Sequence, residues 1–172
     1  MSLLLVQLLN GLANAMFLFL IASGLSLIFG VTRIVNFAHG SFYMLAAYFT
    51  YSLAAALPLG PVAFYAAALL AALLVAALGG LVEVLLLRRV YRAPELYQLL
   101  LTFALVLVVA DAVRFFWGAD NKTGPVAPGL AGSVPIAGQL FPSYDLAVII
   151  FGPLVALGLW LVFHRTRWGI LI

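Results

Sequence analysis

The first 32 residues of the chain contain no charged side chain, and Arg33 is the first charge. A helix needs about 20 apolar residues to cross the ~30 Å hydrocarbon core of a bilayer. A soluble fold does not readily bury an uncharged helix of this length, because one face of that helix must meet water. Over the whole chain 67% of residues are hydrophobic and 8% are charged, against about 25% charged residues in ordinary soluble domains. The sequence therefore predicts an integral membrane protein.

Five apolar segments are long enough to span a bilayer. They cover residues 12–31, 36–57, 62–87, 96–117 and 144–163. Pro58, Pro61 and Pro94 separate three of them, because proline removes a backbone donor and clashes with the preceding helical turn. Residues 118–143 are rich in Gly and Pro and predict an outer loop, in which residues 134–141 have the pattern of a small hairpin. We therefore predict an all-α, polytopic transmembrane helical bundle of about five spanning helices, with all 172 residues in a single domain.

Basic residues predict the orientation of the helices, since cytoplasmic loops of membrane proteins are enriched in Lys and Arg. Five crossings place six of the eight basic residues on one side: Arg33, Arg88, Arg89, Arg92, Arg165 and Arg167. Arg114 and Lys122 fall on the opposite side. The sequence therefore predicts an N-terminus outside the membrane and Ile172 on the cytoplasmic side.

A polar cluster interrupts the apolar pattern near the start of the second segment. Asn36, His39, Gly40 and Tyr43 are spaced at i, i+3, i+4 and i+7, which places them on one face of a helix. An amide and an imidazole facing lipid would cost several kcal/mol without hydrogen bonds. We therefore expect this face to meet protein or a watery cavity, as part of a translocation path or a helix interface. A helix-start cap with a satisfied histidine is the alternative interpretation of the same residues.

Three charged residues lie within or near the predicted spans. Glu83 comes about one turn before Arg88 and is close enough to the inner surface for water or a basic partner to reach it. Asp111 and Arg114 are three residues apart and are able to pair on one helix face. A charge at the bilayer centre costs about 2.5–3.5 kcal/mol, and much less near the ends of a span. We interpret all three as interfacial charges, with a role on a substrate path as the alternative.

Small residues recur at four-residue spacing on three segments. The sets are Ala22, Ser26 and Gly30; Ala68, Ala72, Ala76 and Gly80; and Gly152 and Ala156. Small residues let helix backbones approach closely in a membrane, where little hydrophobic drive holds helices together. For the second set, an alanine-rich composition without structural meaning is the alternative. We expect the second and third sets, like Asn36 and His39, to meet helices outside this chain.

The sequence lacks the residues that several kinds of catalysis require. It contains no cysteine, which excludes thiol catalysis, disulfides and cysteine-ligated metals. It also contains no HExxH, no Ser/His/Asp set and no GxxxxGK(S/T) phosphate loop. His39 and Ser41, the one candidate pair for an intramembrane enzyme, point apart at i and i+2. We therefore predict no catalytic activity and no cofactor or metal, and the scattered basic residues do not suggest nucleic-acid binding.

Several runs of residues give the chain a family resemblance. Residues 24–31 (GLSLIFGV) and 34–40 (IVNFAHG) resemble the inner-membrane permease subunits of branched-chain amino-acid ABC transporters, the Liv type. The match continues in residues 42–48 (FYMLAAY), Glu83, 91–92 (YR), 101–105 (LTFAL) and 116–118 (FWG). It covers nearly the whole chain, and NFAHG is its most specific part.

The resemblance implies a permease subunit of a bacterial inner membrane that provides the translocation path of an ATP-driven importer of branched-chain amino acids. It implies as partners a second related permease subunit, two cytoplasmic ATPase subunits and a periplasmic amino-acid-binding protein. Such permeases continue well past residue 172, with more helices and a loop that docks the ATPase, so the chain resembles their N-terminal portion. A permease for urea, short amides or another amino acid is the alternative, and an intramembrane enzyme is a remote one.

Overall fold

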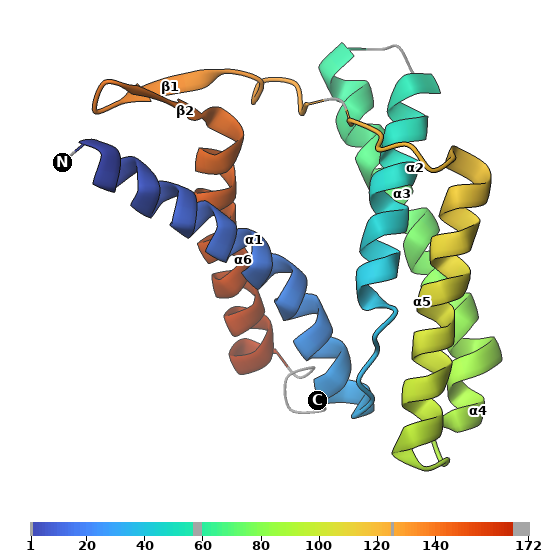
Figure 1. Cartoon of the computed structure of the whole chain (residues 1–172). Coiled ribbons are helices and arrows are strands. Elements are labelled where there is room, and N and C mark those ends of the chain that lie inside the picture. The colour runs from blue at the N-terminus through green and yellow to red at the C-terminus, as the bar shows by residue number, and fades with distance from the viewer. Residues whose placement is uncertain (1, 57–59, 125, 167–172) are drawn as a thin grey trace. The chain divides into compact units, whose positions relative to one another are not determined.

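The computed structural model describes residues 2–56, 60–124 and 126–166. Its long helices are α1 (Ser2–Thr32), α2 (His39–Ala56), α3 (Gly60–Val82), α5 (Glu95–Trp117) and α6 (Ser143–Arg165). Helix α3 continues through a π-helical turn, η1 (Glu83–Leu87), into the short α4 (Arg88–Val90). Two strands, β1 (Ser133–Ile136) and β2 (Gln139–Pro142), complete the described elements (Figure 1).

The predicted helical segments are confirmed, because each of the five coincides with one long helix of the described chain. Four stretches are long and apolar enough to cross a membrane: Leu3–Val31, Gly60–Val90, Glu95–Trp117 and Ser143–Arg165. Helix α2 is not among them. Its 18 residues span about 27 Å at 1.5 Å per residue, and His39, Ser41 and its tyrosines lower its apolar character. Pro58, the C-terminal Trp168 and the predicted cytoplasmic end at Ile172 lie outside the described residues.

The chain divides into two compact units, which are described separately. The first unit contains the described residues of Met1–Val31 and Gly129–Ile172, with α1, the two strands and α6. In this unit α1 and α6 cross (Figure 1). Gly152 of α6 is buried, and a Cβ atom built on it would lie 2.6 Å from the Sδ atom of Met16 in α1. The expectation that Gly152 meets a helix outside this chain is therefore wrong, because α1 occupies that face.

The predicted hairpin is confirmed by the antiparallel pairing of β1 and β2, in which Val134 lies opposite Phe141. Ala137 and Gly138 form the turn with φ angles of 50° and 82°. Positive φ at both central residues is the geometry of a type I′ turn, whose twist matches that of the flanking strands. Phe141 is fully buried, and the Ser143 N–H donates to Gly132 O at 2.9 Å. The hairpin thus leads directly into the first turn of α6.

The second unit, Thr32–Pro128, contains α2, α3, η1, α4 and α5. Helix α3 buries the alanine stripe Ala63, Ala67 and Ala71 and packs against α2. The predicted stripe that begins at Ala68 lies one residue further round α3, where Ala72 and the residues after it on that stripe are exposed. Its partner outside this chain stays a prediction.

Helix α5 is anchored to the rest of the second unit near both of its ends. Thr102 is fully buried, and its Oγ1 atom lies 3.1 Å from Leu99 O and 3.5 Å from Val35 O. At the other end, Trp117 Nε1 donates to Ser52 Oγ of α2 at 2.6 Å. These contacts place the candidate residues of α2 and α5 in one packed unit.

Candidate functional site

The NFAHG sequence forms the turn that leads into α2. The helix begins at His39, three residues after the predicted start, so Asn36 precedes the helix. Asn36 is 8% exposed; its Oδ1 accepts the Ala38 N–H at 3.0 Å and its backbone carbonyl accepts the His39 N–H at 3.1 Å. An asparagine side chain that accepts the N–H group two residues further on forms an Asx turn, and this one orders the turn at the start of α2. The helix-cap interpretation therefore accounts for the Asn36 side chain.

The other members of the polar cluster lie on the first two turns of α2. His39 is half-buried, while Gly40 is exposed and Tyr43 is 48% exposed. Among the described residues, no atom lies within 4 Å of a Cβ built on Gly40. Ser41 points into the unit and is 6% exposed. The cluster therefore combines a buried cap with an adjacent face that the described chain leaves open at Gly40.

Glu83 lies in the π-helical turn and binds two side chains. Its Oε1 atom accepts hydrogen bonds from Arg88 Nε at 2.9 Å and from the Tyr91 hydroxyl at 3.0 Å. Residues five apart in an α-helix point about 140° away from each other. The extra residue of the π turn rotates Arg88 towards Glu83, so that both side chains share one face. Such single π turns are rare and are often found at functional sites.

The turn that follows α4 is held by a buried amide. Gln98 of α5 is 8% exposed, and its Nε2 donates to Ala93 O at 3.0 Å and to Val90 O at 3.2 Å. Val90 O also accepts the Ala93 N–H at 3.0 Å, so the Gln98 side chain links the end of α4 and the turn after it to α5. Partial burial and the Glu83 carboxylate raise the pKa of Tyr91.

Asp111 and Arg114 form the ion pair that their spacing suggests. Arg114 Nη1 lies 3.8 Å from Asp111 Oδ1, and both side chains are more than 70% exposed. Ion pairs this exposed contribute about 0–1 kcal/mol to the stability of a protein. The pair lies near the C-terminal end of α5, whereas Glu83 lies close to the turn before the N-terminal end of α5. The structure thus places the predicted charges at opposite ends of this helix.

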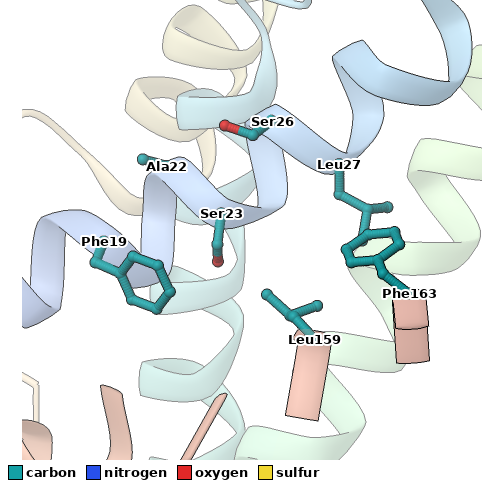
Figure 2. A pocket seen from close by; sticks show the side chains of 7 residues that line it. All are labelled: Phe19, Ala22, Ser23, Ser26, Leu27, Leu159 and Phe163. Carbon is teal, nitrogen blue, oxygen red and sulfur yellow. The ribbon is translucent and has the colours of Figure 1, made fainter. Parts of the chain in front are cut away.

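Two hollows in the described chain were not predicted from the sequence. In the first unit, a groove of about 330 Å³ lies where α1 and α6 diverge; its walls include Ala22 and Ser26 of the predicted small-residue stripe, with Leu159 and Phe163 from α6 (Figure 2). In the second unit, a pocket of about 230 Å³ is lined by residues of α2 and of the segment after α5: Ala47, Tyr48, Tyr51, Asn121, Lys122 and Gly124. The i, i+3 spacing of Tyr48 and Tyr51 is the only sequence signal for this pocket.

Comparison with known proteins decides the family. A family model described as "branched-chain amino acid transport system / permease component" matches residues 7–172. The chain belongs to this permease family. It is therefore a multi-pass membrane protein of a transport family, in agreement with its apolar helices.

A curated relative of this permease family gives the same result. The chain is 28% identical over 171 residues to the "high-affinity branched-chain amino acid transport system permease protein BraD" of Pseudomonas aeruginosa. The alignment covers 95% of the chain and 56% of that relative. The chain therefore spans little more than half the length of the curated permease. No solved structure matches the chain.

Proposed function

We propose that the chain is part of a permease subunit of an ATP-driven importer of branched-chain amino acids and contributes to its translocation path. The family match over residues 7–172 carries this proposal. The apolar helices supply the membrane-spanning scaffold that such a path requires. In this proposal residues 1–172 act as one permease domain in a bacterial inner membrane.

The proposed partners are a second related permease subunit, two cytoplasmic ATPase subunits and a periplasmic amino-acid-binding protein. Residues 1–172 contain no GxxxxGK(S/T) loop, which is consistent with nucleotide binding by the proposed ATPase subunits. Six of the eight basic residues fall on one side of a five-span topology. This bias supports an outer N-terminus and a cytoplasmic turn at Arg92.

We propose that the start of α2 faces the translocation path or a neighbouring helix. The support comes from its chemistry: His39 and Tyr43 present polar groups, while a Cβ at Gly40 would meet open space among the described residues. Substitution Gly40→Leu is therefore expected to preserve the fold of the described chain and to impair assembly or transport. His39→Ala is expected to impair transport without loss of folding. Normal uptake by both variants would rule out this role.

Uptake measurements test the proposed substrate. Cells that lack the gene should accumulate radiolabelled leucine more slowly than the parent strain, and the gene should restore the parental rate. Excess valine or isoleucine should compete with leucine, whereas urea and short amides should not. Competition by urea or an amide in place of valine would support the alternative substrate, and unchanged leucine uptake in the deletion strain would contradict the proposal.

A further inference from the structure

The pocket in the second unit has one wall formed by two tyrosines of α2. Tyr48 and Tyr51 are three residues apart and therefore lie on one face of the helix. The Tyr48 ring packs on Trp117, with 5.3 Å between the ring centroids. Trp117 is itself fixed by its hydrogen bond to Ser52 and by an edge contact with Phe49. The position of this wall is therefore set by the packing of α2 against the end of α5.

The opposite wall is a backbone segment that is held at both ends. Helix α5 ends at Gly118, whose φ of 85° is in the left-handed region and whose N–H donates to Arg114 O at 2.9 Å. A φ in this range is open to glycine and strained for other residues, so Gly118 ends the helix and redirects the chain. Further along, the Tyr65 hydroxyl donates to Pro128 O at 2.9 Å. Asn121 and Lys122 lie between these two anchors and line the pocket.

The lining of the pocket offers donors and apolar surface without any carboxylate. Lys122 carries an ammonium group, Asn121 an amide and Tyr51 a hydroxyl, and among the described residues none of these three forms a hydrogen bond or ion pair. Ala47 and the tyrosine rings supply apolar contacts. The pocket volume of about 230 Å³ is below the ~300–1,000 Å³ of sites for drug-sized ligands. These properties suit a small aliphatic molecule that carries a carboxylate.

We propose that this pocket binds the carboxylate of a small aliphatic amino acid, with Lys122 as its ion-pair partner and Tyr51 and Asn121 as hydrogen-bond donors. The choice of an amino acid, and so of a carboxylate, rests on the proposed function; the preference for a small ligand with an anionic group rests on the pocket alone. Charge-assisted hydrogen bonds are the strong ones, so Lys122 should dominate the affinity. In the proposed topology the pocket lies on the outer side, where an incoming amino acid would meet it first.

A binding experiment on the chain in lipid nanodiscs tests the proposal. Because Tyr48 packs on Trp117, the fluorescence of Trp117 reports on the pocket once the other two tryptophans are replaced, Trp160→Phe and Trp168→Phe. Leucine should change this fluorescence in a saturable manner, and leucinamide, which lacks the carboxylate, should bind about tenfold more weakly. Lys122→Gln should lower the affinity for leucine by a similar factor and leave the affinity for leucinamide unchanged.

The matched control is Asp120→Asn, which alters a neighbouring charge that does not line the pocket and should not weaken leucine binding. Equal affinity for leucine and leucinamide, or an unchanged affinity in Lys122→Gln, would overturn the proposal. Uptake in cells separates this result from the proposed function. Leucine uptake without leucine binding to this pocket would reject the pocket alone. Carboxylate-dependent binding by a chain that takes no part in leucine uptake would support the pocket and reject the proposed function.

Discussion

Arg88 Nε donates a hydrogen bond to Glu83 Oε1 at 2.9 Å across a π-helical turn. In an uninterrupted α-helix these two side chains would point in different directions, about 140° apart. The ion pair and the π turn therefore support each other: the turn creates the shared face, and the pair gives that face a favourable contact. Tyr91 adds a second donor to the same carboxylate oxygen at 3.0 Å.

We predict that Glu83→Gln destabilises the π turn, because it removes the charge that holds Arg88 and Tyr91. Hydrogen exchange of the backbone amides in residues 83–91 should become faster, and the thermal midpoint of the protein in nanodiscs should fall. Arg89→Gln is the matched control, since Arg89 follows Arg88 in the sequence and forms none of the described hydrogen bonds to Glu83. Equal exchange rates in the wild type and Glu83→Gln would show that the turn does not depend on this ion pair.

Gly152 allows the close crossing of α6 and α1. A Cβ at this position would lie 2.6 Å from Met16 Sδ and 3.0 Å from Met16 Cβ. We therefore predict that Gly152→Ala lowers the free energy of unfolding by about 1–3 kcal/mol through overpacking. The added substitution Met16→Ala should recover part of this loss, because it removes Sδ and Cγ, while the Cβ at 3.0 Å remains.

Gly158→Ala is the control for the Gly152 prediction, because no described atom lies within 4 Å of a Cβ there. Replacing a glycine by an alanine in a helix interior stabilises the helix by about 1 kcal/mol through its higher helix propensity. Unfolding by SDS in mixed micelles measures the stability of these three variants and of the wild type. If Gly152→Ala is as stable as Gly158→Ala, the two helices do not pack as closely as described.

The sequence was informative about elements and less informative about contacts. Long apolar segments predict spanning helices because the bilayer sets their length, and all five predicted segments are helical. The turn was recognisable from Gly138, because glycine adopts positive φ without strain, although Ala137 at φ 50° does not share this property. The packed stripe of α3 could not be recognised from the sequence, since alanines occupy both the stripe at Ala67 and the neighbouring stripe at Ala72. Composition alone therefore cannot distinguish the face that meets α2.

For the candidate site residues, too, the sequence predicted local structure better than contacts. Asn36 has a side chain that favours helix starts and turns, and the structure uses it in the turn that leads into α2. The sequence placed Glu83 within reach of a basic partner but did not identify Arg88, because a π turn has no periodic signal in the sequence. The partner of Gly152 was missed because small residues indicate a close approach without identifying the approaching helix.

We predict that Asn36→Ala destabilises the protein by about 1–3 kcal/mol, the usual cost of leaving a buried donor without an acceptor. The Ala38 N–H would lose its side-chain acceptor, and the turn before α2 would become less ordered. Asn36→Asp keeps an acceptor oxygen at the same place and should retain most of the stability. Equal losses from both substitutions would show that the amide contributes through contacts other than the cap.

Cysteine labelling in intact cells tests the predicted orientation, and the absence of native cysteines makes this experiment clean. A cysteine at Ala127, in the segment after α5, should react with a reagent that does not cross the membrane. A cysteine at Ala93, in the turn before α5, should react only after the membrane is opened. The reverse pattern would invert the topology inferred from the basic residues.

Reconstituted transport tests the central claim most directly. The full-length permease, assembled with its partner permease and ATPase subunits in proteoliposomes and supplied with its binding protein, should accumulate radiolabelled leucine only when ATP is available to the ATPase subunits. Omission of the permease that contains this chain should abolish accumulation, and valine should compete. Leucine accumulation that proceeds equally without ATP, or without this permease, would contradict its assignment to the path of an ATP-driven branched-chain amino-acid importer.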